Sequence, residues 1–258
     1  MIRVHETPPR LAAPDADQVK VRETVRLPVD LPAPPITAIR ADDLDGQFES
    51  FRGTGQTHTF ALFAKRCLDI AGATVGLIVL SPLFVAVGVA ILLTDGRPIL
   101  FRQARVGLHG RIFSVVKFRT MARDADEHRS DLRQYNEVSG NASFKMTNDP
   151  RITRIGGILR RSSIDELPQL WNVLRGEMSL VGPRPHPLDD VDGYEPWHRR
   201  RLAMKPGITG LWQVEGRREV DFDQWVRFDL EYIDHWSFWL DLRLLIKTIP
   251  AMLRAEGR

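Results

Sequence analysis

The longest apolar stretch of the chain runs from Ile70 to Leu93 and contains no ionisable side chain. Fourteen of its residues are Leu, Ile, Val or Phe. At about −0.3 to −0.6 kcal/mol each, they contribute roughly −4 to −8 kcal/mol towards membrane insertion, before Gly, Ser and Pro subtract from that total. The core helix of a water-soluble domain normally keeps a polar face. The pattern therefore predicts that this stretch enters a membrane.

Two arrangements in the membrane fit this stretch. A straight helix of this length would reach about 36 Å, enough to cross a hydrocarbon core of about 30 Å. Ser81 and Pro82 lie in its middle, however, and a proline there removes a backbone hydrogen bond and bends the helix, while the serine hydroxyl can serve a freed carbonyl. Basic residues flank both ends, namely Lys65, Arg66, Arg97, Arg102 and Arg105. This symmetry suits a re-entrant hairpin on the cytoplasmic side, whereas a kinked spanning helix remains the alternative.

The pattern divides the chain into three segments. Residues 1–62 hold seven of the 17 prolines and no lasting apolar period, which predicts a disordered or loosely structured tail with at most a local strand near Val21–Leu27. Residues 63–96 are the expected re-entrant membrane helix. Residues 97–258 are the expected cytoplasmic catalytic domain at the membrane interface.

The third segment predicts an α+β fold that is mainly helical, with a small α/β catalytic domain. Alternating and β-branched residues over Ile99–Met121 predict extended structure with a turn at Gly107–Gly110. Residues 122–145 are polar and predict a surface helix or loop. Aromatic and apolar residues over Tyr232–Leu253 are typical of an amphipathic helix, which either lies at the membrane interface or packs on the catalytic core.

Residues 163–176 carry the period of a helix. Four residues recur at helical spacing and predict its buried face: Leu167, Leu170, Trp171 and Leu174. Gly176 is a suitable end. Ser163 and Glu166 match a capping box, so one ordinary interpretation of Asp165 and Glu166 is that they cap the helix and favour its dipole.

A second interpretation of the two acids is catalytic. Cations surround them in the sequence, namely Lys117, Arg119, Arg160, Arg161 and Arg184. Chemistry on a diphosphate uses guanidinium groups and a metal ion to neutralise phosphoryl oxygens while a carboxylate attacks. Pro183 and Pro185 restrict the backbone on either side of Arg184, which either presents the guanidinium to a ligand or forms a rigid surface turn.

Composition narrows the classes of function. One cysteine, Cys67, excludes an internal disulfide framework and a cysteine zinc cluster. The acidic, proline-studded start does not resemble a signal peptide. A net charge of +3 and a pI near 9.2 suit contact with phosphates or an anionic membrane. This charge is too dilute for a nucleic-acid binder, and such a binder leaves the apolar stretch unexplained.

Four motifs together resemble the bacterial sugar transferases, the monotopic phosphoglycosyl transferases that begin polysaccharide and glycoconjugate assembly. They are Lys117–Met121 (KFRTM), Ser163–Gln169 (SIDELPQ), Asn172–Pro185 (NVLRGEMSLVGPRP) and Pro206–Val214 (PGITGLWQV). The resemblance extends from about Lys65 to the C-terminus and is to the short forms of the family. It favours the re-entrant hairpin, because the family bends its membrane helix at a Ser-Pro pair.

The resemblance also implies a mechanism. Asp165 and Glu166 would act with Mg²⁺, and Asp165 would attack the β-phosphate of a UDP-sugar, release UMP and hold the sugar phosphate until a lipid phosphate displaces it. Glu166 would be a metal ligand, a helper base or a cap. The remaining candidate residues are implied to bind or orient substrate: Lys117, Arg119, Arg160, Arg184, and Gly210 and Gln213 of the Pro206–Val214 loop, which otherwise forms an ordinary turn.

The expected partners are a UDP-sugar, undecaprenyl phosphate and membrane lipids at the cytoplasmic face of the bacterial inner membrane, with no nucleic acid. A homodimer is compatible with the sequence. Galactose or glucose is the favoured sugar, with an N-acetylhexosamine as the alternative donor. A membrane-anchored scaffold without enzymatic activity is the competing class of function.

Overall fold

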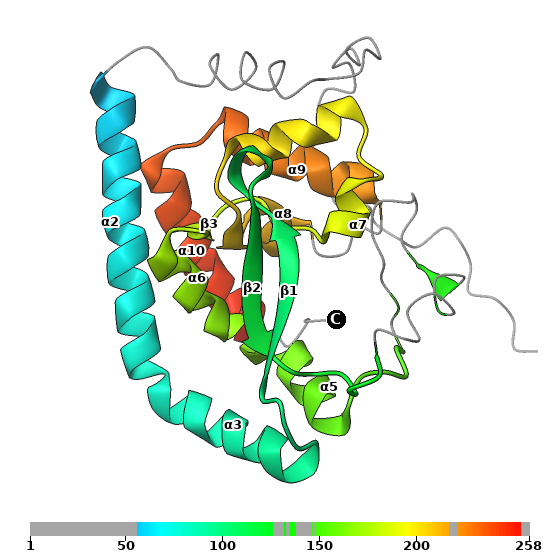
Figure 1. Ribbon diagram of the computed structural model, residues 1–258. Coiled ribbons are helices and arrows are strands. Elements are labelled where there is room, and N and C mark those ends of the chain that lie inside the picture. The colour runs from blue at the N-terminus through cyan, green and yellow to red at the C-terminus, as the bar shows by residue number, and fades with distance from the viewer. Residues whose placement is uncertain are drawn as a thin grey trace, which may run out of the picture. The chain divides into compact units, whose positions relative to one another are not determined.

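The computed structural model describes residues 56–125, 132, 135–137, 146, 148–216 and 221–253 (Figure 1). The predicted tail lies outside the described residues up to position 55, and so does the strand expected near Val21–Leu27. Most of the polar segment 122–145 also lies outside them. Helix α2 begins at Gln56, within the range assigned to the tail.

The described elements are helices of very different lengths and two small sheets, so the predicted α+β, mainly helical fold is confirmed. In chain order they are α2 (Gln56–Val79), α3 (Ser81–Thr94), β1 (Leu100–Val106), η1 (Leu108–Gly110), β2 (Ile112–Phe118), α5 (Arg154–Arg161), η3 (Ile164–Gln169), α6 (Leu170–Arg175), β3 (Ser179–Val181), α7 (Leu188–Val191), η4 (Pro196–Ala203), β4 (Gly207–Thr209), α8 (Leu211–Glu215), α9 (Phe222–Asp234) and α10 (Phe238–Leu253).

Helices α2 and α3 meet at a bend of 58°, and the predicted bend at the Ser-Pro pair is confirmed. Pro82 has no N–H to donate to the carbonyl of Ile78, four residues earlier. The Ser81 hydroxyl donates to that carbonyl instead, at 2.8 Å. Among the described residues, no single helix has the length and apolar composition to cross a membrane, but this bent pair meets both criteria together.

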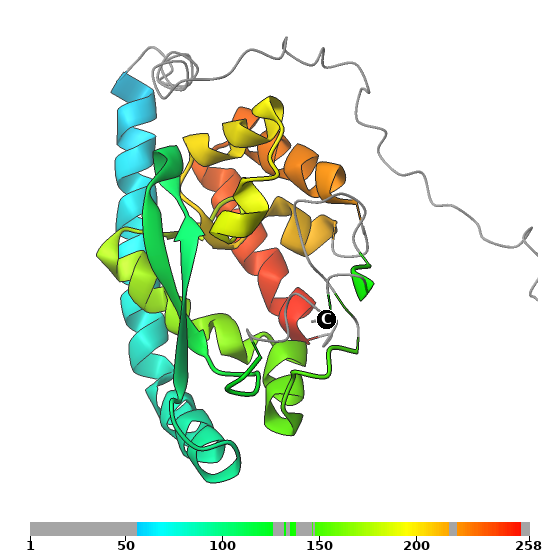
Figure 2. The same cartoon turned by 45° about the vertical axis from the view of Figure 1, so that its right-hand side comes forward.

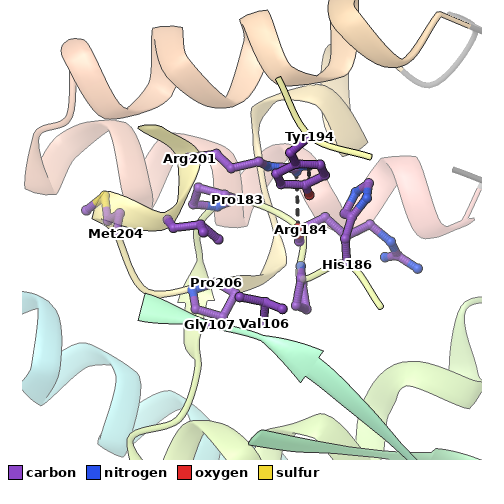
Figure 3. A pocket seen from close by; sticks show the side chains of 11 residues that line it. Val106, Gly107, Pro183, Arg184, His186, Tyr194, Arg201, Met204 and Pro206 are labelled. Carbon is purple, nitrogen blue, oxygen red and sulfur yellow. Dashed lines mark hydrogen bonds between the residues drawn. The ribbon is translucent and has the colours of Figure 1, made fainter. Parts of the chain in front are cut away.

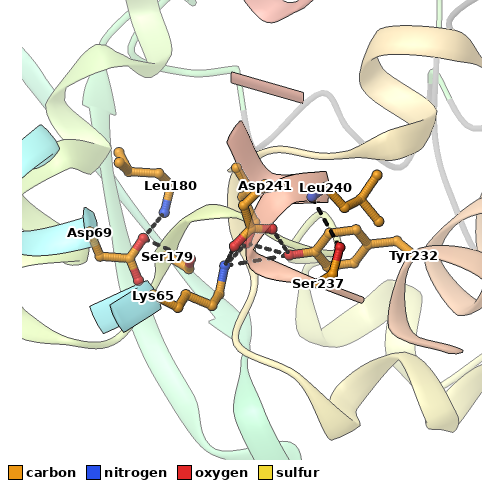
Figure 4. A network of polar contacts seen from close by, with 9 residues as sticks. Lys65, Asp69, Ser179, Leu180, Tyr232, Ser237, Leu240 and Asp241 are labelled. Carbon is orange, nitrogen blue, oxygen red and sulfur yellow. Dashed lines mark hydrogen bonds and ion pairs between the residues drawn. The ribbon is translucent and has the colours of Figure 1, made fainter. Parts of the chain in front are cut away.

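Buried ionic contacts attach α2 to the rest of the structure (Figure 4). The Lys65 ammonium, 6% exposed, donates to the Asp241 carboxylate on α10 at 2.6 Å and to the carbonyl of Val181 at 2.9 Å. The Tyr232 hydroxyl donates to the same carboxylate at 2.7 Å. One turn along α2, Asp69 accepts from the Leu180 N–H at 2.8 Å. Helix α2, strand β3 and helix α10 are therefore joined by one polar network.

The Asn172 side chain of α6 makes hydrogen bonds to strand β2, beside the apolar contacts of Val115 with Leu170 and Val173. Strands β1 and β2 pair antiparallel, and the turn between them includes η1, as predicted. Asn172 accepts from the Val116 N–H at 3.0 Å and donates to the Ser114 carbonyl at 2.7 Å. These contacts satisfy backbone groups of β2 that no third strand reaches. Helix α6 therefore covers this edge of the hairpin (Figures 1 and 2).

The predicted burial of residues 163–176 is wrong at one position. Trp171 is 53% exposed, whereas Asn172 and Val173 are buried. The segment begins as the 3-10 helix η3 and becomes α-helical only at Leu170. Since a 3-10 helix has three residues per turn and not 3.6, the phase of the sequence pattern does not hold across the junction. Gly176 ends α6 in the left-handed region (φ 78°), as predicted.

Helix α10 packs on the core, as one alternative for the C-terminal stretch predicted, and its position at a membrane interface stays a prediction. Leu244 is 1% exposed and belongs to a cluster with Trp225, Val226 and Leu230 of α9. On the other side of the helix, the apolar side chains of Trp239, Ile246 and Ile249 are mostly exposed. One face of α10 therefore packs on the core and another presents apolar side chains outward.

Replacing Lys65 by Met tests the network around it. The change leaves the Asp241 carboxylate buried without its cation, which is expected to lower the free energy of unfolding by about 3–5 kcal/mol. The control is Lys247→Met, which removes a lysine of α10 that is paired with Glu215 at an exposed site outside this network, where a change below about 1 kcal/mol is expected. Denaturation in detergent micelles measures both. Equal stabilities of the two variants would contradict the assigned role of Lys65.

Candidate active site

The two neighbouring carboxylates lie in the first turn of η3. Ser163 precedes them in the left-handed region (φ 56°, ψ 17°), so the chain turns sharply between α5 and η3. Strand β2 packs beside η3 and brings Lys117 near the acids. Asp165 is only 7% exposed. The turn therefore places a carboxylate in a largely buried position among cations.

The predicted capping box is wrong. Ser163 makes no side-chain capping hydrogen bond, because its left-handed backbone differs from the extended conformation of an N-cap. Glu166 instead accepts from both terminal nitrogens of Arg184, from Nη1 at 3.1 Å and from Nη2. This bidentate ion pair gives Glu166 a fixed partner.

The environment shifts the pKa values of the two acids in opposite directions. Burial, with the negative charge of Glu166, raises the pKa of Asp165 to about 6, against the opposing effects of Lys117 and Arg160. Burial acts in the same direction on Glu166, but the Arg184 guanidinium outweighs it and holds the pKa of Glu166 below its usual value. Asp165 takes part in none of the ion pairs formed among the described residues. Such separated pKa values assign different roles to two carboxylates.

Lys117 is a partly buried cation close to the two acids. Burial and the neighbouring Arg105 lower its pKa to about 8, while the two carboxylates act in the opposite direction. Its Nζ lies 5.4 Å from the centre of the Phe101 ring. The ammonium therefore interacts with the acids electrostatically from the hairpin.

Arg184 is positioned by the backbone around it and not by an isolated surface turn. The Gly207 N–H donates to the Pro183 carbonyl at 2.8 Å, and a Cβ on Gly182 or Gly207 would collide with the facing backbone. Arg201, fully buried and paired with Asp229, donates to the carbonyl of Arg184 at 3.1 Å (Figure 3). This arrangement holds the backbone of Arg184 from two sides.

The remaining candidates divide into two groups. Arg160, at the end of α5, acts electrostatically on Asp165 and so lies with the acids. Arg119 donates at 2.7 and 2.8 Å to the carbonyls of Asp95 and Gly96, just after α3. Gly210 packs against the Gly182 carbonyl, and Gln213 donates to the Ile208 carbonyl at 2.8 Å. These last three residues support the backbone near the site; their assignment to substrate stays a prediction.

The structure adds Arg105, which the sequence interpretation treated only as a flanking charge. Its Nη1 donates to the Pro185 carbonyl at 2.8 Å, and its charge lowers the pKa of both Lys117 and Glu166. The pairing register of the hairpin shows why Arg105 lies near Lys117. Phe101 pairs with Lys117, so Arg105, four residues along β1, projects from the same face of the hairpin as Lys117.

The two carboxylates fit Mg²⁺ only if another group completes its coordination. Within the described ranges, no cluster of three or more His, Cys, Asp or Glu side chains is arranged to hold a metal ion. Mg²⁺, however, is usually held by one or two carboxylates together with water and substrate phosphates. A diphosphate bound between Asp165 and the cations would supply the missing oxygens.

The chain resembles a known family over most of its length. Residues 60–255 match the family model described as bacterial sugar transferase. The galactosyl transferase CpsE of Streptococcus agalactiae is 47% identical over 197 residues, which are 76% of this chain and 43% of that protein. The chain therefore spans less than half the length of this relative.

Two shorter relatives are covered more fully. The exopolysaccharide production protein ExoY of Rhizobium meliloti is 40% identical over 207 residues, 79% of this chain and 92% of the relative. The UDP-glucose:undecaprenyl-phosphate glucose-1-phosphate transferase of Caulobacter vibrioides is 42% identical over 201 residues, 75% of this chain and 71% of the relative.

Replacing Asp165 by Asn is expected to stabilise the fold. Its folded pKa of about 6 exceeds the ordinary value of 3.8, so the ionised side chain destabilises the folded state progressively as the pH rises from about 4 to 6. Above pH 6 the variant should gain up to about 3 kcal/mol of unfolding free energy, and the gain should vanish near pH 4. Denaturation curves at pH 4 and pH 8 measure it.

Glu166→Gln is the matched comparison. It weakens the pair with Arg184, so a loss of stability is expected at pH 8, opposite in sign to Asp165→Asn. If both substitutions shift stability in the same direction at pH 8, the assigned difference between the two carboxylates is wrong.

Proposed function

The chain belongs to the bacterial sugar transferase family, and we propose that it transfers a sugar 1-phosphate from a UDP-sugar to undecaprenyl phosphate at the cytoplasmic face of the inner membrane. The observation that carries the proposal is the pairing of Glu166 with Arg184 beside a buried Asp165 that lacks such a partner. Two relatives, a galactosyl transferase and a UDP-glucose:undecaprenyl-phosphate glucose-1-phosphate transferase, support galactose or glucose as the sugar.

The proposed reaction has two displacement steps at the β-phosphorus of the donor. A carboxylate oxygen of Asp165 forms a bond to this phosphorus, and the bond to the oxygen shared with the α-phosphate breaks, so UMP leaves with the electron pair. An oxygen of the lipid phosphate then attacks the same phosphorus, and the Asp165 carboxylate leaves. The products are UMP and undecaprenyl-diphosphate-sugar.

Asp165 is better suited than Glu166 to be the nucleophile. Arg184 occupies both oxygens of Glu166, whereas Asp165 forms no competing ion pair with any residue that the structure describes. A pKa of about 6 leaves most Asp165 side chains ionised at neutral pH, and the partly desolvated oxygen is more reactive than one in water. Glu166 orients Arg184 and lowers the net charge of the cation cluster.

The surrounding cations are placed to receive phosphate oxygens. Lys117, Arg160 and Arg184 are all close enough to Asp165 to lower its pKa by their charge. Each can stabilise charge that shifts to the leaving UMP. When bound, Mg²⁺ would be held by Asp165 or Glu166 with the donor diphosphate, and it would neutralise part of that diphosphate's charge.

The bent pair α2–α3 supplies the proposed membrane attachment. Its apolar side chains are outward over much of both helices, for example Val75, Ile78, Val85 and Leu93. The buried contacts of Lys65 and Asp69 hold the middle of α2 on the catalytic core, just before the apolar stretch begins. Because Arg119 holds the residues directly after α3, both flanks of the apolar stretch lie against the same body. We therefore propose the re-entrant hairpin.

Trapping the covalent intermediate tests the reaction. Wild-type protein mixed with UDP-galactose or UDP-glucose and Mg²⁺, without acceptor, should release about one UMP per site and gain the mass of a hexose phosphate on Asp165. Asp165→Asn should show neither, because the amide is a poor nucleophile. The yield should also fall as the pH drops through about 6, since the carboxylate becomes protonated.

An adduct on another residue, or equal UMP release by wild type and Asp165→Asn, would overturn the assignment of the nucleophile. Asp190→Asn is the control for removing a carboxylate elsewhere, because Asp190 lies in α7 and near His186, not in η3. It is expected to keep the burst of UMP.

The topology is tested with single cysteines in a Cys67→Ser background. Phe60→Cys and Arg97→Cys lie on opposite sides of the bent pair, and both positions are exposed. For a re-entrant hairpin, a membrane-impermeant maleimide should label neither cysteine in intact cells and both after lysis. Labelling of just one position in intact cells is the outcome for a spanning helix.

A further inference from the structure

An apolar groove with a volume of about 660 Å³ lies between α3, the β1–β2 hairpin and the η3–α6 segment. This volume is within the range of about 300–1,000 Å³ found for small-molecule sites. Its lining includes Val89 of α3, Arg102 of β1, and Pro168 and Trp171 of the η3–α6 segment. Arg102 alone among the described lining residues is ionisable. The groove is therefore an apolar surface with a cation on its wall.

The groove ends close to the proposed nucleophile. Pro168 lines it, and Asp165 lies three residues earlier in the same 3-10 helix. Residues i and i+3 of a 3-10 helix are eclipsed, with a rise of about 6 Å between them. Asp165 and Pro168 therefore share one edge of η3, and a single turn separates the groove from the reacting carboxylate.

The hairpin separates the groove from the cations of the active site. Arg102 and Val116 are register partners and both line the groove. Phe101 and Lys117 are also partners and project from the opposite face, because side chains alternate along a strand. A water-soluble nucleotide and an apolar molecule can thus approach Asp165 from different faces of the hairpin.

Resting on the proposed function, we propose that this groove binds the first isoprene units of the polyprenyl phosphate acceptor. The second displacement brings the acceptor phosphate to the phosphorus held on Asp165, so the units next to that phosphate must lie within a few ångströms of η3. The groove is the apolar surface that reaches this point, and Arg102 complements the charge of the phosphate as the chain enters. Trp171, 53% exposed, forms one wall against which the chain packs.

A side chain that fills the groove should weaken binding of the acceptor and not of the donor. Val89→Trp places a large ring among the lining side chains. Leu93→Trp is the matched control, because Leu93 lies one turn later on the same helix, is 79% exposed and does not line the groove. We expect Val89→Trp to raise the KM for undecaprenyl phosphate about tenfold or more and to leave the donor-only UMP burst intact. The control should change the acceptor KM less than about twofold.

Photolabelling with competition identifies which molecule binds in the groove, independently of turnover. A polyprenyl phosphate that carries a photoreactive group on its second isoprene unit should label the peptides containing Trp171 or α3 in wild type and less so in Val89→Trp. Undecaprenyl phosphate should compete with this labelling, and phosphatidylglycerol at the same concentration should not. Equal competition by phosphatidylglycerol, or an unchanged acceptor KM in Val89→Trp, would show that ordinary bilayer chains fill the groove and would overturn the proposal.

The two proposals fail in different ways. If wild-type protein releases no UMP and forms no adduct, the proposed reaction is wrong, and the photolabelling competition still decides whether the groove selects a polyprenyl phosphate. If the burst occurs but photolabelling maps away from α3 and Trp171, the reaction stands and the groove assignment is wrong.

Discussion

The ion pair between Glu166 and Arg184 is the contact on which the site depends. Two adjacent carboxylates in a largely buried turn repel each other, and both would lose much of their charge without compensation. Arg184 compensates only one of them, with two parallel hydrogen bonds. Asp165 is consequently left as the group with the raised pKa and the free oxygens. A single arginine thus distinguishes two residues that are neighbours in sequence and alike in chemistry.

The position of this arginine depends on close backbone packing far along the chain. Strands β3 and β4 pair in parallel, and Gly182 and Gly207 allow their ends to approach more closely than any side chain would permit. Arg201 then fixes the Arg184 carbonyl from the opposite side. Gly182 and Gly207 therefore have a clear structural use: they bring two loops together behind the guanidinium.

Much of this could be predicted from the sequence, and the failures have physical causes. Period and turn residues were sufficient for the β1–β2 hairpin and for the bend at Pro82, because these are local features. The capping box at Ser163 failed because one left-handed residue reverses the chain there. The predicted burial of Trp171 is wrong because a 3-10 turn changes the helical phase. Arg105 was missed because its proximity to Lys117 depends on strand register, which the alternation of residues alone does not fix.

The network around Lys65 has a mechanical consequence. Since the ammonium, the Asp241 carboxylate and the Tyr232 hydroxyl are all buried together, the part of α2 around Lys65 cannot rotate against α10 without exposing or separating charges. We therefore expect the bent pair and the η3 turn to move together as one rigid body. In the proposed re-entrant attachment, the height of Asp165 above the lipid headgroups would change with bilayer thickness, and the rate of the proposed reaction would then depend on that thickness.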